Sequence, residues 1–228
     1  MNYTFIVLGI ILVVVLFILY KVFTEKKTKL ETNKQLTTNS HPYEDLKNPV
    51  SPNFYIAIWL YVHSINSTSG NNVIYHIDNA KSSGTTKFEL DITGNGTLQY
   101  TADSRTVPIM EKFPLQKWTH VIIGVTSGNL IDSYVDGKLM KSQELNNTLT
   151  TDHNYALKEG TTNKTADANV AGFERVPEII TPKEAWDKYL AGNGGNMFTR
   201  FFQTWGLSLV LTKDNEDQKT INFPPDFS

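Results

Sequence analysis

The chain has 228 residues, no cysteine and a formal net charge of −2 with no long run of one sign. These values exclude a disulfide-based scaffold and disfavour a nucleic-acid partner, which would require a basic surface. The length fits a membrane segment followed by one domain of roughly 180 residues, which can form a core without metals or cofactors.

The first 20 residues carry no charged side chain, and the run from 5 to 20 is almost entirely apolar. Twenty helical residues span about 30 Å, the thickness of a bilayer core. We therefore predict a retained transmembrane anchor over 1–23, with membrane-spanning positions that include Phe5, Ile10, Val15 and Tyr20. A cleaved signal peptide is the alternative, but the basic n-region and the Ala-x-Ala cleavage site are absent.

The charges that flank this run predict its orientation. Lysine is absent before it, whereas Lys21, Lys26, Lys27 and Lys29 follow it, which places the domain on the cytosolic side. The sequons are then chance matches, and their glycosylation would contradict this orientation; they lie at Asn66, Asn95, Asn146 and Asn163.

Residues 24–52 are polar and lack an apolar period, and Pro42, Pro49 and Pro52 disfavour a helix. We predict a stalk over 24–52 and a globular domain over 53–228. The domain opens with a strand over 54–63 whose two faces both carry apolar side chains, which is typical of a central strand covered on both sides.

Further short strands follow, separated by turn residues. We predict strands over 73–77, 87–92 and 97–101, the last two joined by a turn at Gly94, Asn95 and Gly96. Residues 107–117, with Pro108 and Pro114, are predicted to form a connection.

The stretch 117–145 predicts a three-stranded meander. β-Branched residues run from Val121 to Val125, Ser127–Asn129 interrupts them, and Asp136–Gly137 is the signal of a two-residue hairpin turn. The order of residues resembles the central hairpins of concanavalin A-like lectin/glucanase sandwiches, especially laminin-G-like domains. The residues that match are Trp118, His120, Val121, Tyr134, Val135, Asp136, Gly137, Lys138 and Leu139.

The C-terminal part predicts one helix among loops and strands. Residues 146–172, rich in Asn, Thr and Asp, are predicted to form a long surface loop. Thr181, Pro182 and Glu184 form a helix start, and a helix is expected over 185–190, ended by the glycines from Gly192. Strands are expected over 198–203, 206–212 and 219–223. The predicted fold is an all-β antiparallel sandwich, a concanavalin A-like jelly roll with one short helix, preceded by a single transmembrane helix.

The segment from Thr181 to Gly194 resembles membrane-anchored laminin-G-like proteins of large double-stranded-DNA viruses, as do the Gly206–Leu209 strand and the Lys213–Asn215 turn. The resemblance implies a minor capsid protein between an internal virion membrane and the capsid. Its implied partners are the lipid bilayer and other capsid proteins, with the 146–172 loop as the expected contact. A capped helix that packs Trp186 and Tyr189 explains the helical segment without any virus.

One strand carries a pair of carboxylates. Laminarinase-type enzymes of this fold carry Glu-x-Asp followed by a second Glu, which supplies a nucleophile and an acid. Glu89 and Asp91 match the first two positions, but Thr93 and Gly94 stand where the last Glu is needed. We predict that Glu89 and Asp91 are not catalytic and that the protein is not an enzyme.

Metal ligation is not predicted either. The five histidines show no His-Glu-x-x-His spacing. Asp132 and Asp136 fall short of the six to eight oxygens of a Ca²⁺ site.

Two functions follow. The first is a non-enzymatic structural tether between membrane and capsid. The alternative is a membrane-displayed carbohydrate-binding module, for which Tyr55, Trp59 and Tyr61 are the ligand-facing aromatic candidates, with Tyr75 and Tyr100 weaker ones. Core packing explains these aromatics equally well. Orientation separates the two functions, because a lectin requires its domain outside.

Overall fold

The computed structural model of the chain describes residues 12–13, 16, 29–67, 70–79, 86–102, 104–149, 155–162, 164–193, 207–213 and 216–223. The predicted anchor over 1–23 lies outside these ranges except for Leu12, Val13 and Leu16, which are helical. Among the described residues, no helix is both long and apolar enough to cross a bilayer.

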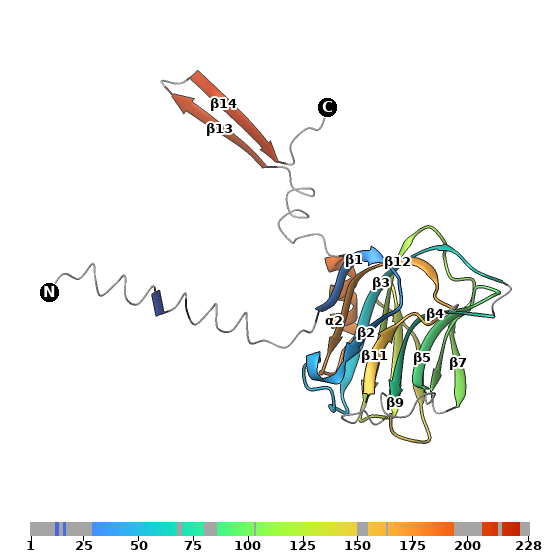
Figure 1. Cartoon of the computed structure of the whole chain (residues 1–228). Helices are drawn as coiled ribbons and strands as arrows, with labels where there is room; N and C mark the ends of the chain where they lie inside the picture. The colour runs from blue at the N-terminus through green and yellow to red at the C-terminus, as the bar shows by residue number, and fades with distance from the viewer. Residues whose placement is uncertain are drawn as a thin grey trace.

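Two antiparallel six-stranded sheets form a sandwich (Figure 1). Sheet I has the order β1 (Lys29–Gln35), β12 (Asp167–Val176), β3 (Phe54–Ser64), β8 (Trp118–Thr126), β9 (Leu130–Val135) and β10 (Lys138–Glu144). Sheet II has the order β2 (Asn39–Pro42), β11 (Tyr155–Glu159), β4 (Asn71–Asn79), β5 (Thr86–Thr93), β6 (Leu98–Ala102) and β7 (Arg105–Met110).

The remaining elements are a 3₁₀ turn η1 (Tyr43–Asp45), helix α2 (Pro182–Ala191) and a C-terminal hairpin of β13 (Leu207–Lys213) and β14 (Glu216–Phe223). The all-β antiparallel sandwich with one short helix is therefore confirmed. The predicted strand over 198–203 lies outside the described residues.

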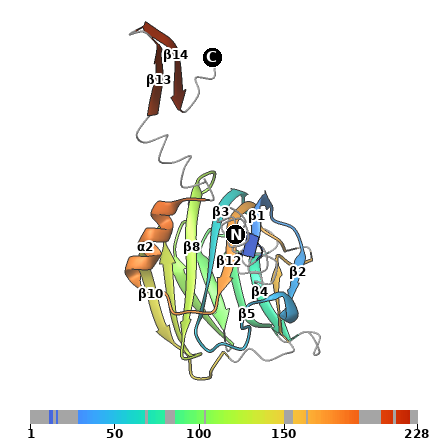
Figure 2. The same ribbon diagram turned by 90° about the vertical axis from the view of Figure 1, so that its left-hand side faces the viewer.

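The core lies between the two sheets and follows the alternation of the strands. On β3, Phe54, Ile56, Ile58, Leu60 and Val62 point into it and are almost fully buried. The opposite face of β3 is also covered, by α2, which lies on the outer face of sheet I near β8 and β10 (Figure 2). This double coverage explains why β3 is apolar on both faces.

Two predicted local structures are confirmed in detail. Asp136 and Gly137 both have positive φ, 48° and 75°, as a type I′ turn requires, and they join β9 to β10. Thr181 caps α2 through a capping box: its hydroxyl accepts from the Glu184 amide, and the Glu184 carboxylate accepts from the Thr181 amide.

The predicted stalk contains strands of the sandwich, which corrects that prediction. β1 pairs with β12 at the edge of sheet I, and β2 pairs with β11 at the edge of sheet II. Leu46 is buried in the core, and the buried Arg175 donates hydrogen bonds to the carbonyls of Lys47 and Pro49. These polar residues form strands because they pair with β12 and β11. Both partners lie more than a hundred residues later in the chain, so the segment itself carries no signal of the pairing.

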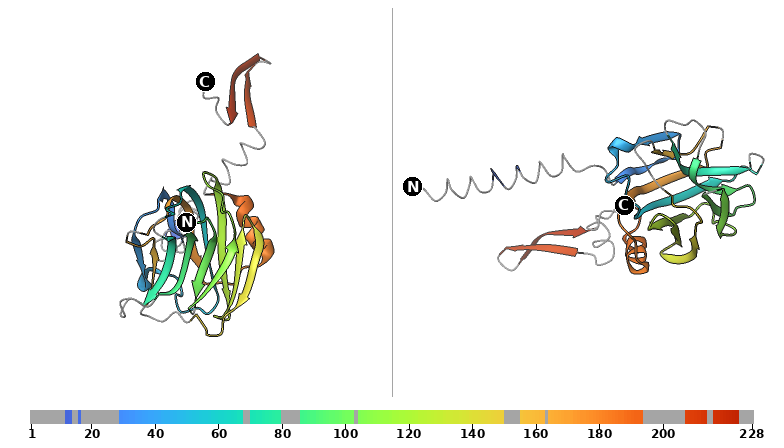
Figure 3. Two further views of the ribbon diagram at one scale, coloured as in Figure 1. Left: turned by 90° about the vertical axis from the view of Figure 1, so that its right-hand side faces the viewer. Right: turned by 90° about the horizontal axis from the view of Figure 1, so that it is seen from below.

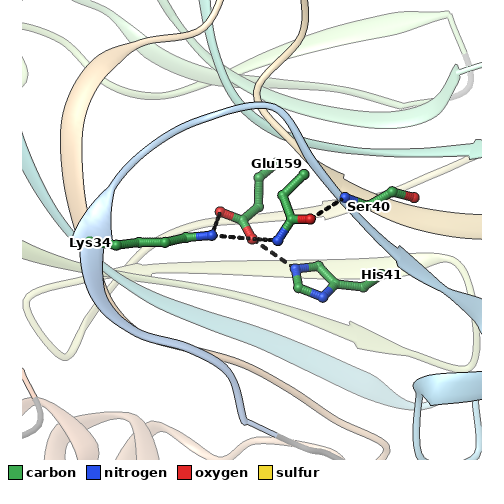
Figure 4. Close-up of polar contacts among 5 residues, drawn as sticks. Lys34, Ser40, His41 and Glu159 are labelled. Atoms are coloured by element: carbon green, nitrogen blue, oxygen red, sulfur yellow. Dashed lines mark hydrogen bonds and ion pairs between the residues drawn. The ribbon is translucent and has the colours of Figure 1, made fainter.

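A buried carboxylate holds this N-terminal segment in place (Figure 4). Glu159 on β11 is fully buried, and its Oε1 lies 2.7 Å from His41 Nε2 on β2. Lys34 on β1 places its ammonium 3.4 Å from Oε2. A buried charge of this kind is strongly destabilising without its partners, so the cluster favours the docked position of β1 and β2.

Two predicted connections are strands as well. The 146–172 segment contains β11 and most of β12, and β12 lies inside sheet I, with Ala168, Val170 and Ala171 fully buried. Alanine carries little apolar signal in a sequence, so this strand was missed. β7 overlaps the start of the predicted 107–117 connection. Pro108 is tolerated in it because β7 is an edge strand.

Candidate functional site

The outer face of sheet II carries a polar row that crosses the strands in register. His76 on β4 lies opposite both Lys158 on β11 and Glu89 on β5. The row continues through Thr101 to Thr106. His76 Nε2 is 3.1 Å from Asp78 Oδ2, which also accepts from the Lys158 ammonium at 3.2 Å. These contacts tie most of the charges in this row to one another.

The predicted carboxylate pair lies on this face of β5. Asp91 is fully buried and accepts one hydrogen bond, 3.0 Å from Gln99 Nε2, while its Oδ2 has no partner among the described residues. Burial raises the pKa of Asp91 to about 7, with a further contribution from the charge of Glu89. Thr93 follows at the end of β5, so this strand holds two carboxylates, and the third of the glucanase pattern is missing.

Two of the predicted ligand-facing aromatics lie on the outer face of sheet I beneath α2. Tyr55 is 7% exposed and Trp59 is 8% exposed. Tyr55 packs with Ala57, Ile122 and Ala185, the last of which belongs to the helix. Tyr75 and Tyr100 are completely buried in the core between the sheets. Core packing therefore explains four of the five aromatics in this arrangement.

Trp59 lies in a stack of rings that includes a residue from α2. Its ring is 4.7 Å from that of His120 at 19° and 5.8 Å from that of Tyr189 at 20°. Gly172, at the bulge of β12, has a φ of +55° and approaches the same indole. Tyr189 thus covers a tryptophan that sequence reasoning placed at a ligand surface.

Of two polar side chains beneath or on α2, Lys188 has hydrogen-bond partners, whereas one nitrogen of His120 has none among the described residues. Lys188 donates to Glu174 Oε1 at 2.6 Å, and its ammonium lies 5.1 Å from the centre of the Tyr55 ring. Burial alone would lower the pKa of Lys188, but the hydrogen bond to Glu174 helps raise it above its ordinary value. His120 is 3% exposed, and its Nδ1 has no partner among the described residues. Burial, and secondly the charge of Lys188, lower the pKa of His120 to about 4.

The third predicted aromatic, Tyr61, belongs to a cluster that α2 leaves open. Its ring is 5.6 Å from that of Trp118 and 5.1 Å from that of His63. His63 is exposed, and the other two rings are half-buried. We call Tyr61, His63 and Trp118 the open aromatic cluster.

Hydrogen-bonding groups border the open aromatic cluster. Asn169 on β12 lies opposite Tyr61 and shares its face of sheet I. On the other side, Lys117 is 3.6 Å from Asp136 Oδ2. Rings beside groups that donate and accept hydrogen bonds can hold a ligand that is apolar on one face and polar at its rim.

The contacts of Asp136, one of the two carboxylates considered for Ca²⁺, are with protein groups. Asp136 accepts from the His120 amide at 2.9 Å and is paired with Lys117. Among the described residues, no group of three or more His, Asp or Glu side chains is placed to hold a metal ion.

Sequence reasoning recognised Trp118 as part of a motif and missed its place beside Tyr61. It also missed Lys188 as a partner of sheet I, and it expected Tyr189 to pack without identifying Trp59 as its partner. A signal existed for the helix residues, because Ala185, Lys188 and Tyr189 share one face at helical spacing.

A model of the concanavalin A-like lectin/glucanases superfamily, of the laminin-G type, matches residues 32–173. The chain belongs to this superfamily. A search of curated protein sequences finds no match. The family match ends within β12, so α2 and the C-terminal hairpin lie outside it.

Among solved structures, the domain is similar to the Trypanosoma rangeli sialidase, with a TM-score of 0.51, 14% identity and 62% of this chain covered. It is also similar to the botulinum neurotoxin serotype G binding domain, with a TM-score of 0.52, 14% identity and 70% of this chain covered. The chain spans only 23% of the sialidase and 42% of the toxin domain. At these identities the likeness shows a shared fold.

Proposed function

We propose that this domain is a non-enzymatic glycan-binding module whose ligand stacks on the open aromatic cluster. The observation that carries the proposal is the placement of Tyr61, His63 and Trp118 on one open surface beside polar side chains. A pyranose ring has an apolar face of C–H groups and a rim of hydroxyls, which fits such a surface.

Two further observations support this function. The fold is shared with part of a sialidase whose structure has been solved with sialic acid, which favours a sugar as the ligand class. Glu89 and Asp91 match the first two positions of the glucanase pattern, but Thr93 and Gly94 stand where the second Glu is needed, so one of the two carboxylate roles of retaining hydrolysis has no residue. Binding without turnover is therefore the activity that the site supports.

Replacing Trp118 by alanine is expected to weaken glycan binding at least tenfold, because it removes the largest ring of the open aromatic cluster. Binding partners are first sought on a glycan array, and affinities are then measured by titration calorimetry. His63→Ala, which removes an exposed ring, tests the same surface with little risk to folding. Tyr43→Ala, a half-buried tyrosine on η1, is the matched control. Unchanged affinity in both cluster variants would contradict the proposal.

The second candidate function is a tether between an internal virion membrane and the capsid, with residues 1–23 as the anchor. The uncharged run and the lysines after it support this candidate. The position of β1 adds a structural constraint: only residues 21–28 separate the apolar run from the sandwich, so they reach at most about 29 Å. The proposed anchor would hold the domain close to the membrane.

The two candidates require opposite orientations, and the sequons report on them. Asn95, in the turn between β5 and β6, and Asn146 are both exposed. If the domain faces the lumen, as a glycan-binding module displayed outside requires, the full chain expressed in eukaryotic cells will lose mass on treatment with peptide N-glycosidase. The variant with glutamine at all four sequon asparagines is the control. An unmodified chain that is digested by protease added to sealed microsomes supports the cytosolic tether instead.

A further inference from the structure

We propose that α2 is a displaceable cover over a second part of the same glycan-binding face, and that Tyr189 occupies the place on Trp59 that a pyranose ring takes when the cover lifts. This inference rests on the proposed function and names a subsite that is closed in the unliganded protein. Figure 3 shows α2 outside the two layers of the sandwich.

The covered surface continues the open aromatic cluster. On the paired strands β3 and β8, Trp59 lies opposite His120, and the next pair on the same face is Tyr61 opposite Trp118. A glycan chain seated on Tyr61 and Trp118 would therefore meet Trp59 with its next unit. Tyr189 blocks that path by stacking nearly parallel to Trp59, at 5.8 Å and 20°.

The covered surface also contains a polar atom that the cover leaves unsatisfied. His120 Nδ1 is buried and has no hydrogen-bond partner among the described residues. An atom of this kind costs free energy in the closed state. A sugar hydroxyl beside Trp59 could pair with this nitrogen, whereas the ring of Tyr189 stacks on Trp59 without pairing with it.

Only one residue of the cover is fully buried. Ala185 is the only fully buried residue of α2, while Trp186 is 41% exposed and Leu190 is 54% exposed. A ten-residue helix has little stability of its own, so its contacts with sheet I decide whether it stays closed. Besides Ala185 and the ring stack, α2 is held by the ion pair between Lys188 and Glu174 and by the close approach of Trp186 and Tyr189 to Gly137. The segment lies beyond residues 32–173, which match the family model.

The energetics predict opposite effects for the two stacked rings. Closing the subsite reduces the apparent affinity by the fraction of molecules that are open. Tyr189→Ala removes the ring that competes with the ligand, so binding is expected to tighten roughly three- to tenfold. Tyr189→Phe keeps the ring and should bind like the wild type. Trp59→Ala removes the subsite and should abolish the gain in the double variant.

Hydrogen exchange tests the cover directly, with laminarihexaose and 3′-sialyllactose as probes. In the free protein, the amides of α2 should exchange at least tenfold faster than those of β3 and β8, through local opening. Saturating probe should make α2 exchange faster still. Exchange of α2 only on global unfolding would overturn the inference, whether or not a glycan binds.

Binding measurements separate this inference from the proposed function. Protection of α2 by bound probe, or weaker binding by Tyr189→Ala, would show that Tyr189 belongs to the site and is not its cover. Binding by Tyr189→Ala where the wild type binds no probe would support the cover strongly. A further outcome is that α2 opens locally but neither the wild type nor any variant, Tyr189→Ala included, binds a probe or a glycan on the array. The proposed glycan-binding function is then wrong, and so is the pyranose ligand assigned to the subsite. Only the mobility of α2 would remain.

Discussion

Replacing Asp91 by asparagine is expected to stabilise the domain above pH 7 by roughly 2–4 kcal/mol. Burial raises the pKa of this carboxyl from an ordinary value near 4 to about 7 in the folded state. Between these two values the folded protein binds the proton more tightly than the unfolded chain does. The stability of the wild type therefore falls as the pH rises from about 4 to 7, by about 1.4 kcal/mol for each unit of difference in pKa.

The asparagine variant should not show this fall, so the difference between the two proteins grows from pH 4 to 7 and is constant above. Asparagine keeps an oxygen for the hydrogen bond from Gln99 and carries no charge. Urea unfolding at several pH values gives the free energy of unfolding of both proteins. Glu111→Gln, which removes an exposed carboxylate that does not contribute to the pKa of Asp91, is the control. A difference that does not depend on pH would contradict the burial of a titrating Asp91.

This result also bears on function. Carboxylates that destabilise their own domain are found at many functional sites, because binding and catalysis often require a desolvated group with a shifted pKa. Asp91 has no second acid in the geometry that hydrolysis needs. We therefore expect no hydrolysis by the wild type or by the asparagine variant. If the purified domain hydrolyses β-glucan and loses that activity in Asp91→Asn or Glu89→Gln, the non-enzymatic function is wrong.

Replacing His120 by glutamine is expected to remove a second pH dependence, which runs in the opposite direction. Burial and the charge of Lys188 lower the pKa of His120 to about 4 in the folded state, against about 6.5 in an unfolded chain. As the pH falls from 6.5 to 4, the unfolded chain takes up the proton and the folded one does not. The wild type should lose up to roughly 2–3 kcal/mol over this window, and none of this effect should remain above it.

His120→Gln keeps a polar side chain and should flatten the curve between pH 4 and 6.5. His63→Gln, on the same sheet face but exposed, is the control and should leave the curve unchanged. Thermal unfolding by circular dichroism follows both variants, with Asp91→Asn as the background that removes the opposing slope. A curve that remains steep in His120→Gln would show that His120 is not held neutral under α2.

The features that the sequence determined by itself depend on neighbouring residues. The Asp136–Gly137 turn requires positive φ at both positions. Few residue pairs allow this, chiefly Asn or Asp followed by Gly, and Gly-Gly. The capping box at Thr181 satisfies its own helix end. The double-sided apolar pattern of 54–63 predicted a covered central strand, which β3 is. Local rules of this kind are legible because the partners lie within a few residues.

The tertiary structure alone decided the features that depend on partners far away in the chain. The segment 29–45 is polar, and it forms strands because Glu159, more than a hundred residues later, binds Lys34 and His41. β12 lies inside sheet I and carries buried alanines. Alanine has a small side chain and gives little apolar signal of a core strand in a sequence. The position of Tyr189 on Trp59 follows from how α2 docks on the finished sheet. Docking is decided by the summed surface of several strands, which no stretch of the sequence contains.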